Sequence, residues 1–434
     1  MRASTGIDRR RSWALGLSWL TLLACATNPA PEPAPAPPSP RPDAARLDSL
    51  RERARADSVR IARATRAAAA PPALKYPRPS ARTDTLTIRA LRAPVRVCAG
   101  GDVTLGTNLA PEWSRKAQKT MRTKFHRRDD PASLLAPLRT FFRGADVVLV
   151  NVESAIGEGP TQPKCGPKST NCFAFRSPPA SAAALRKLAP PNRIVVGNLA
   201  NNHAHDAGKA GQDSTVAALL GAGVLVTGDD TLATPVPTPA GDTIGVLGFY
   251  TSKDTPDARD TAAVHRHVVR ASEQYPVVIV TMHLGAEGLA AQNTRDTSEL
   301  YLGIDRGNPV AFADAAVRGG AALVVGHGPH VLRAMEWREG GALIAYSLGN
   351  LLTYGPFVLK EPLNRGAVLC TTLGPTGRVA SASLRPTMQR APGVLQADRT
   401  RRAFALADSL SRLDFPASGV HVEKSGTLRP QIWR

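Results

Sequence analysis

The 434-residue sequence is poor in cysteine, in aromatic residues and in acidic residues relative to basic ones. Five cysteines are too few for a disulfide-rich scaffold. An apolar content of 43% excludes a wholly disordered chain, so a folded core must exist. The formal charge of +20 suggests nucleic acid, but basic and aromatic residues are not interleaved in the core. We therefore expect no nucleic-acid partner.

The amino-terminal apolar run is too short to span a bilayer stably. It extends from Trp13 to Ala24 and follows Arg9, Arg10 and Arg11, the layout of an export signal. Its end, Leu-Leu-Ala-Cys25, resembles the bacterial lipoprotein signal, in which this cysteine becomes the lipidated first residue. We predict a lipoprotein-type signal peptide over residues 1–25. The protein is then exported and anchored by Cys25 to a membrane of the cell envelope, in the periplasm or on the outer surface. The alternative is an ordinary signal peptide in which Cys25 is incidental.

Residues 26–93 are expected to form a tether. The tract NPAPEPAPAPPSPRP favours extended polyproline geometry. Residues 43–70 predict an Arg-rich helix, which is either a solvated spacer or a helix lying on anionic lipid or cell-wall polymer. More than half of the basic excess precedes residue 97, so the charge belongs mainly to this arm.

From residue 94 short apolar runs alternate with helical stretches. Strands are predicted at Val95–Ala99, Val147–Val152, Ile194–Leu199, Gly223–Thr227, Ile244–Phe249, Val277–Met282, Leu323–Val325, Leu343–Ser347 and Ala367–Thr372. Helices are predicted at Pro131–Arg143, Ser181–Leu188, Gly208–Gly221, Asp260–Gln274 and Asn308–Arg318. Apolar strands separated by helices indicate an α/β layered sandwich, with buried β-sheets flanked by helices. We assign it to residues 94–375, and residues 376–434, with a helix at Thr400–Leu413, to a C-terminal extension.

Polar side chains follow five of the predicted strands, where α/β folds bind ligands. They are Asp102, Glu153, Asn201, Asn202, His203, Asp206, His283, Glu287, His327 and His330. Imidazole, carboxylate and amide oxygen together suit Mn²⁺, Fe²⁺ or Zn²⁺, rather than structural zinc or Ca²⁺. The sequence therefore predicts a site for one or two divalent metal ions.

Three of these residues have expected chemical roles. Glu153 is a candidate bridge between two cations that hold a hydroxide for attack. His203 is placed to donate a proton to a leaving oxygen. Asp206 either holds His203 in the useful tautomer or caps the helix that begins near Ala207.

Six ordered motifs over residues 95–372 resemble the CapA family of poly-γ-glutamate capsule biosynthesis proteins, whose fold is that of the calcineurin-like metallophosphoesterases. The motifs are GGDVTLG, VNVESAIG, NLANNHAHDAG, TMHLGAEG, GHGPH and AYSLGN. The resemblance implies a metallo-dependent-phosphatase-like sandwich. It places Asp102, Glu153, Asn202, His283, His327 and His330 on metal-ligand positions and His203 on the catalytic-acid position. Asn201, Glu287, Ser347 and Asn350 fall on further motif positions, near the substrate or around the metal ligands.

The chain departs from the family patterns at four positions. Thr104 stands where ordinary metallophosphoesterases carry a histidine, and Glu153 replaces the bridging Asp. One of the two metal positions then has fewer or longer ligands, which favours a single tightly held ion. Gly328 and Ala322 stand where CapA members frequently carry His and Asp.

These features predict a metal-dependent hydrolase that uses a metal-bound hydroxide on an anionic envelope substrate, either a phosphoester or an amide of poly-γ-glutamate or peptidoglycan type. The alternative is a non-catalytic metal-containing protein that binds or exports a polyanionic capsule polymer. The expected partner is accordingly a polyanionic envelope polymer or a small anionic substrate.

The cysteines fit an exported protein. Cys165 and Cys172 flank a short loop and are a candidate disulfide. Cys98 and Cys370 lie in apolar strand patterns and are expected to be buried small hydrophobes.

Overall fold

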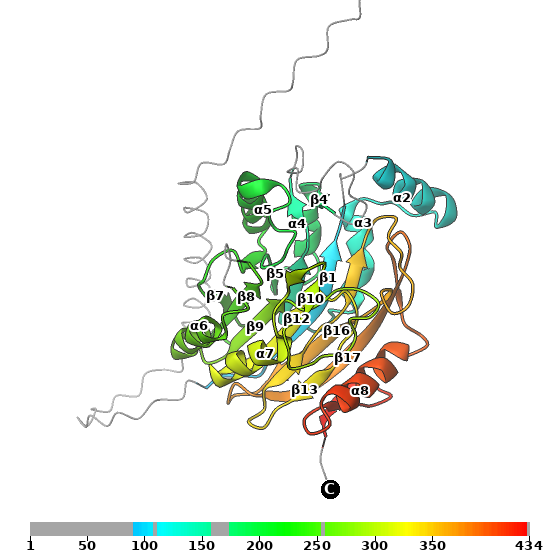
Figure 1. The fold of residues 1–434 in the computed structure, drawn as a ribbon. Helices are drawn as coiled ribbons and strands as arrows, with labels where there is room; N and C mark the ends of the chain where they lie inside the picture. The colour runs from blue at the N-terminus through cyan, green and yellow to red at the C-terminus, as the bar shows by residue number, and fades with distance from the viewer. Residues whose placement is uncertain (1–89, 107–110, 158–172, 253–256, 432–434) are drawn as a thin grey trace, which may run out of the picture. The chain divides into compact units, whose positions relative to one another are not determined.

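The computed structural model describes residues 90–106, 111–157, 173–252 and 257–431 (Figure 1). The predicted signal peptide with Cys25, residues 26–89 of the tether and its Arg-rich helix lie outside the described residues. The candidate disulfide between Cys165 and Cys172 lies outside them as well.

The larger sheet has ten strands. They are β1 (Val95–Thr104), β2 (Val147–Val152), β5 (Ile194–Asn198), β6 (Leu225–Thr227), β15 (Asn350–Thr353), β16 (Arg365–Leu373), β17 (Val379–Arg390), β18 (Val394–Ala397), β19 (Val420–Val422) and β20 (Thr427–Pro430). Their order is β19-β20-β17-β16-β1-β2-β5-β6, with β15 beside β1 and β18 beside β17. The residues assigned to a C-terminal extension thus continue this sheet, since β17 pairs antiparallel with β16.

The second sheet has the strands β7 (Thr234–Pro237), β8 (Thr243–Tyr250), β9 (Val278–His283), β12 (Ala321–His327), β13 (Met335–Trp337) and β14 (Leu343–Ala345). Their order is β13-β14-β12-β9-β8-β7. Two small ribbons pair β3 (Ala155–Ile156) with β4 (Arg176–Ser177), and β10 (Leu300–Tyr301) with β11 (Ile304–Asp305).

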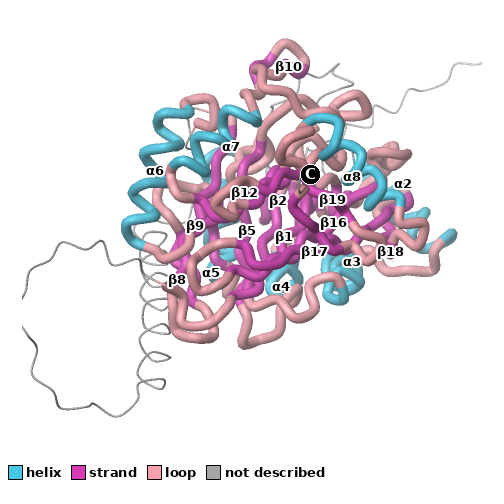
Figure 2. Tube along the Cα trace, turned by 90° about the horizontal axis from the view of Figure 1, so that it is seen from below, coloured by secondary structure: helices cyan, strands magenta, loops and turns pink. Residues whose placement is uncertain are grey.

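Helices lie on the outer faces of both sheets, except the last helix, which packs against the apolar cluster between the sheets (Figure 2). They are α2 (Pro111–Lys124), α3 (Pro131–Leu135), the 3₁₀ helix η1 (Ala136–Thr140), α4 (Ala180–Arg186), α5 (Gly208–Gly221), α6 (Thr261–Gln274), α7 (Pro309–Arg318) and α8 (Arg402–Asp414). Among the described residues, no helix has both the length and the apolar character needed to cross a membrane.

Strand periodicity explains the layers, because successive side chains point to opposite faces of a sheet. Val97 of β1 packs between the two sheets with Ile279 of β9 and Val325 of β12. Its neighbour Cys98 faces the other way, into a cluster that includes residues of α3, α4 and α5. A third cluster packs β9 and β12 against α6 and α7. The predicted α/β layered sandwich with helices on its outer faces is confirmed.

Most predicted elements are present, and β2 and α5 have the predicted bounds. The helix predicted at Pro131–Arg143 divides instead into α3 and η1. Pro137 lies at the division and has no backbone N–H to continue the α-helical hydrogen bonds.

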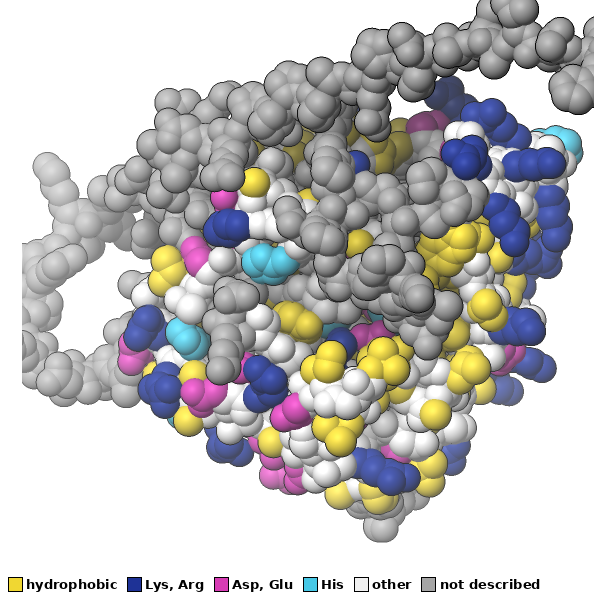
Figure 3. All heavy atoms as spheres, turned by 45° about the horizontal axis from the view of Figure 1, so that its top comes forward, with side chains coloured by type: hydrophobic (Ala, Val, Ile, Leu, Met, Phe, Trp, Pro, Cys, Tyr) yellow, Lys and Arg dark blue, Asp and Glu magenta, His cyan; other side chains and the backbone are white. Residues whose placement is uncertain are grey.

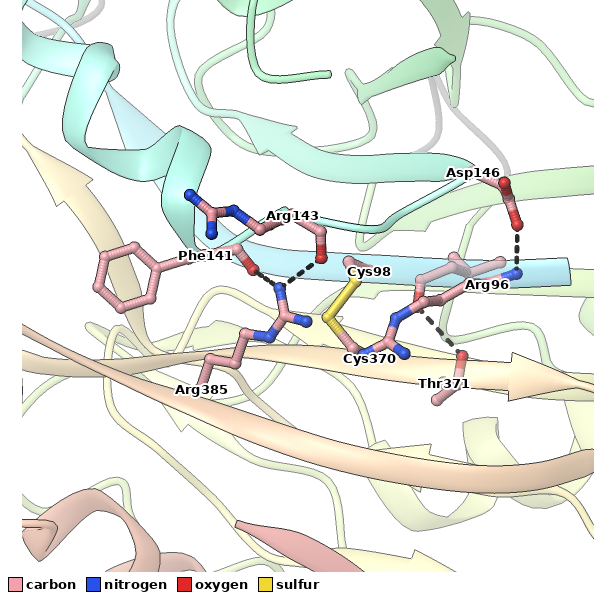
Figure 4. Close-up of a disulfide and its surroundings, with 9 residues drawn as sticks. Arg96, Cys98, Phe141, Arg143, Asp146, Cys370, Thr371 and Arg385 are labelled. Atoms are coloured by element: carbon pink, nitrogen blue, oxygen red, sulfur yellow. Dashed lines mark hydrogen bonds between the residues drawn. A yellow bond between two sulfur atoms is a disulfide. The ribbon is translucent and has the colours of Figure 1, made fainter. Parts of the chain in front are cut away.

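Cys98 and Cys370 form a disulfide across β1 and β16 (Figure 4). They are direct partners in the antiparallel register, with Cα atoms 4.0 Å apart. Both are buried, as expected, but the expectation of free hydrophobic side chains was wrong. The two residues are 272 positions apart, so only the pairing of β1 with β16 brings them together.

We expect the double substitution Cys98→Ala and Cys370→Ala to lower the free energy of unfolding by about 2–4 kcal/mol, because the disulfide restricts the unfolded chain. Urea unfolding of the oxidised wild-type and variant proteins measures this difference. Equal stabilities, or free thiols at both positions in a non-reducing peptide map, would contradict the disulfide.

Candidate metal centre

Four parallel strands bring their carboxyl ends to one region. On the larger sheet, Asp102 of β1 is the register partner of Asn151 of β2. On the second sheet, His283 of β9 is the partner of His327 of β12. All four side chains are buried, so the polar groups at these strand ends must satisfy one another or a ligand.

Asp102, Glu153 and His330 form the centre of the site, with one potential ligand atom from each lying within 4.8 Å of the others. His330 Nδ1 is 3.0 Å from Asp102 Oδ2, and its Nε2 is 3.7 Å from Glu153 Oε1. His330 has a φ of 61°, an unusual value for a residue with a side chain. Asn350 fixes this backbone by donating to the carbonyl of His330 at 3.2 Å.

His283 and His327 lie beside this group. His283 Nε2 is 3.8 Å from Glu153 Oε1, and His327 Nδ1 is 3.7 Å from Asp102 Oδ1. Five of the six predicted ligands are therefore together. The sixth, Asn202, is half-buried in the turn that follows β5.

Several buried atoms of this site have no hydrogen-bond partner. They are both carboxylate oxygens of Glu153, Nε2 of His283 and both ring nitrogens of His327. Each buried polar atom without a partner destabilises the fold by about 1–3 kcal/mol. A divalent cation would satisfy these atoms together, and imidazole with carboxylate suits Mn²⁺, Fe²⁺ or Zn²⁺. The residues present therefore fit the predicted metal.

The charges in the site depend on one another. Burial, and then the charge of Asp102, raise the pKa of Glu153 well above its usual range. Although burial opposes it, the carboxylates of Glu153, Asp102 and Glu287 hold the pKa of His330 well above the ordinary value. Burial lowers the pKa of His327 to about 4. A protonated His330 thus supplies positive charge among acidic groups where a metal ion would supply more.

Asn151 connects the ligands, and the sequence analysis did not single it out. Its Nδ2 donates to Asp102 Oδ1 at 2.8 Å and lies 3.1 Å from His283 Nδ1. Its Oδ1 accepts hydrogen bonds from Asn198 at 3.0 Å and Asn201 at 3.1 Å. The strand period gave a signal for it, because Asn151 lies two positions before Glu153, and side chains two positions apart in an extended chain point to the same side.

His203 and Asp206 form a hydrogen-bonded pair. Asp206 Oδ2 is 2.5 Å from His203 Nδ1 and also accepts from the N–H of Phe175 at 2.6 Å. Asn201 accepts from the His203 N–H at 3.0 Å. The N-cap residue of α5 is Ala207, which makes no side-chain capping hydrogen bond. Of the two roles considered for Asp206, the geometry therefore matches that of orienting His203.

Glu287 is paired with an arginine that the sequence analysis missed. Its Oε1 is 2.7 Å from Nη1 of Arg306, and its Oε2 is 3.6 Å from His330 Nε2. Although burial works against it, the interactions with His330 and Arg306 lower the pKa of Glu287 to about 2. Arg306 lies in the loop between β11 and α7, outside every motif, so no local pattern identified it.

We expect Asn151→Ala to weaken metal binding about 10- to 100-fold, because Asp102 and His283 lose the residue that orients them. Metal titration with dialysis and elemental analysis measures the affinity. The matched control is Asn192→Ala, at an exposed position, which should bind metal like the wild type. Equal affinities for all three proteins would show that Asn151 does not orient the ligands.

Metal binding should release protons and strengthen as the pH rises. Glu153 and His330 have raised pKa values, so each keeps its proton up to a higher pH than an ordinary Glu or His, and a bound metal ion must displace that proton. His327 is already uncharged at neutral pH. Calorimetry in buffers of different ionisation enthalpy should show net proton release on metal binding, and the affinity should rise with pH. Release of no protons, with an affinity that does not change with pH, would contradict this arrangement.

The family model for bacterial capsule synthesis proteins, PGA_cap, matches residues 96–354. No curated protein matches the chain. Among solved structures, the 5′-nucleotidase precursor from Thermus thermophilus is 12% identical at a TM-score of 0.35, over 75% of this chain and 59% of that one.

GAP50, the anchor in the inner membrane complex of Plasmodium, is 9% identical at a TM-score of 0.33, over 73% of this chain and 95% of that one. This chain spans 59% of the length of the nucleotidase. The matched family segment covers more than half of the chain and contains all six motifs. The chain therefore belongs to the bacterial capsule synthesis (CapA) family.

Proposed function

We propose that this protein is a metal-dependent hydrolase that acts on an anionic substrate of the cell envelope, a phosphoester or an amide of poly-γ-glutamate or peptidoglycan type. The observation that carries the proposal is the His203–Asp206 pair near the metal ligands. A protein that only held a polymer would not need an oriented proton donor. The charge of His203 acts on both His283 and Glu287, so the pair is within electrostatic reach of the site.

Asp102, Glu153, His283, His327 and His330 would hold the metal. When bound, a divalent ion supplies Lewis-acid chemistry that activates water and offsets negative charge developing on the substrate.

His203 would serve as the general acid. The carboxylate of Asp206 would accept a hydrogen bond from Nδ1–H and stabilise the protonated ring, so that Nε2–H of the imidazolium could donate its proton to the leaving oxygen or nitrogen. The ring of Phe175 lies 4.3 Å from that of His203 and contacts Phe173 and Phe357 in turn. These apolar rings limit the access of water on one side of His203, which strengthens its interaction with Asp206.

An anionic substrate is supported by the charge of the surface. Figure 3 shows basic side chains gathered over α2. Lys116, Lys119, Arg122 and Lys124 of this helix are exposed, and residues 113–128 contain no Asp or Glu. Such a surface attracts polyanions and concentrates them near the protein.

We further propose that the protein is exported and held to a membrane of the cell envelope by a lipid on Cys25. The support is the layout of residues 1–25, with basic residues, a short apolar run and the cysteine. The Pro/Ala-rich tether of residues 26–93 would then separate the domain from the lipid surface.

We expect His203→Gln to lower kcat about 10²- to 10⁴-fold, the usual contribution of a general acid, while metal content stays the same. The assay uses an aryl phosphate, poly-γ-glutamate and muropeptides with Mn²⁺ or Zn²⁺. The matched control is His421→Gln. His421 also pairs with an aspartate, Asp408, at 2.8 Å, but its side chain is 55% exposed and lies outside the site.

Two outcomes would contradict the proposal. Metal-loaded wild-type protein that turns over none of these substrates would favour the alternative of a non-catalytic polymer-binding protein. Turnover that His203→Gln leaves unchanged would show that another group donates the proton.

A further inference from the structure

Arg306 lies at the foot of the β10–β11 hairpin and is only 5% exposed. Its N–H donates to the carbonyl of Glu299 at 2.8 Å, and its own carbonyl accepts from the N–H of Gly285 at 2.8 Å. Gly285 comes two residues after the ligand His283. The backbone of Arg306 is therefore fixed beside the loop that leaves the metal site.

The guanidinium of Arg306 uses only part of its hydrogen-bonding capacity. Nη1 is 2.7 Å from Glu287 Oε1, whereas Nε and Nη2 are buried and have no partner. Among the described residues, no other buried arginine leaves both of these atoms without a partner. Nε and Nη2 form one edge of the planar group, with two parallel N–H donors that match the two oxygens of a carboxylate or phosphoryl group.

The buried Arg333 provides a contrast in the same region. Its Nε donates to the carbonyl of Ala291 at 2.6 Å, and Nη1 and Nη2 donate to the carboxylate of Glu299 at 2.9 and 2.7 Å. Arg333 is thus fully used in holding the loop. A structural role alone does not account for the free edge of Arg306, because leaving buried donors without partners is unfavourable.

Arg306 is also close to the reacting region. Glu287 forms an ion pair with Arg306 through one carboxylate oxygen and lies 3.6 Å from the ligand His330 through the other. After burial, the charge of Arg306 is the next largest cause that lowers the pKa of His283. Asp102, Glu153 and Glu287 would repel an anionic substrate, and a guanidinium beside them offsets that repulsion.

From this geometry we infer that Arg306 forms an anion subsite next to the metal ligands, in which Nε and Nη2 bind two oxygens of a carboxylate or phosphoryl group of the substrate. The inference rests on the proposed hydrolase function in one respect: the bound anion belongs to the molecule that is cleaved. It deepens that function by giving Arg306 the role of a residue that determines specificity.

The test measures anion binding by calorimetry, using the full chain loaded with Mn²⁺. Inorganic phosphate and glutarate are the two probes, and they distinguish a phosphoryl from a carboxylate ligand. The variants are Arg306→Gln and Arg306→Lys, which keeps the charge but loses the paired donors. The matched control is Arg259→Gln, because Nε and Nη2 of Arg259 are both occupied by Asp257. Elemental analysis gives the metal content of each protein.

We expect wild-type protein to bind at least one probe, and both Arg306 variants to bind it about tenfold or more weakly at unchanged metal content. Arg259→Gln should bind like the wild type. No binding by the wild type, or wild-type affinity in metal-loaded Arg306→Lys, would overturn the inference. If both variants lose the metal or fail to fold, a crystal structure of the wild-type protein grown with phosphate tests the subsite instead. An anion bonded to Nε and Nη2 supports the subsite, and its absence there rejects it.

The same measurements separate this inference from the proposed function. Anion binding that depends on Arg306, without turnover of any substrate, would contradict the hydrolase alone. Turnover with an unchanged KM in Arg306→Lys would contradict the subsite alone.

Discussion

The burial of two carboxylates at adjacent strand ends is the constraint on which the rest of the site depends. Asp102 and Glu153 are almost completely inaccessible to solvent. Two like charges cannot both stay ionised in such a place without a nearby cation. Glu153 responds with a strongly raised pKa, and His330 responds by holding its proton between the acidic groups. A divalent ion would resolve the same conflict more completely, since it would also satisfy the unpartnered atoms of Glu153, His283 and His327.

The layered fold makes this burial possible. Because both sheets direct parallel strands toward one region, residues from β1 and β2 meet those at the ends of β9 and β12. Asn151 links the two sheets at this point, with hydrogen bonds to Asp102 and close approach to His283. Behind the site, the apolar cluster between the sheets and the bond between Cys98 and Cys370 hold β1 in place. A rigid frame of this kind would hold the candidate ligand atoms in place for a metal ion.

The residues around the candidate metal ligands differ from them in chemical character. His203 is oriented by Asp206 and packed against Phe175, which suits a proton donor in a partly apolar setting. Glu287 is paired with Arg306, whose remaining donors suit an anion. A substrate that spans the metal ligands would have its leaving group protonated by His203 and an anionic group bound by Arg306. Under the proposed function, the site would favour a substrate that carries negative charge near the bond to be cleaved.

The sequence by itself determined the family, the α/β class and the residue types at the strand ends. Each of these depends on local patterns: apolar runs, helix periods and motifs of a few residues, such as the one that contains His327 and His330. The tertiary structure alone decided the bond between Cys98 and Cys370, the continuation of the sheet by β17 to β20, the contacts of Asn151 and the position of Arg306. These features join segments far apart in the chain, and such contacts form only when strand pairing and side-chain packing bring the segments together.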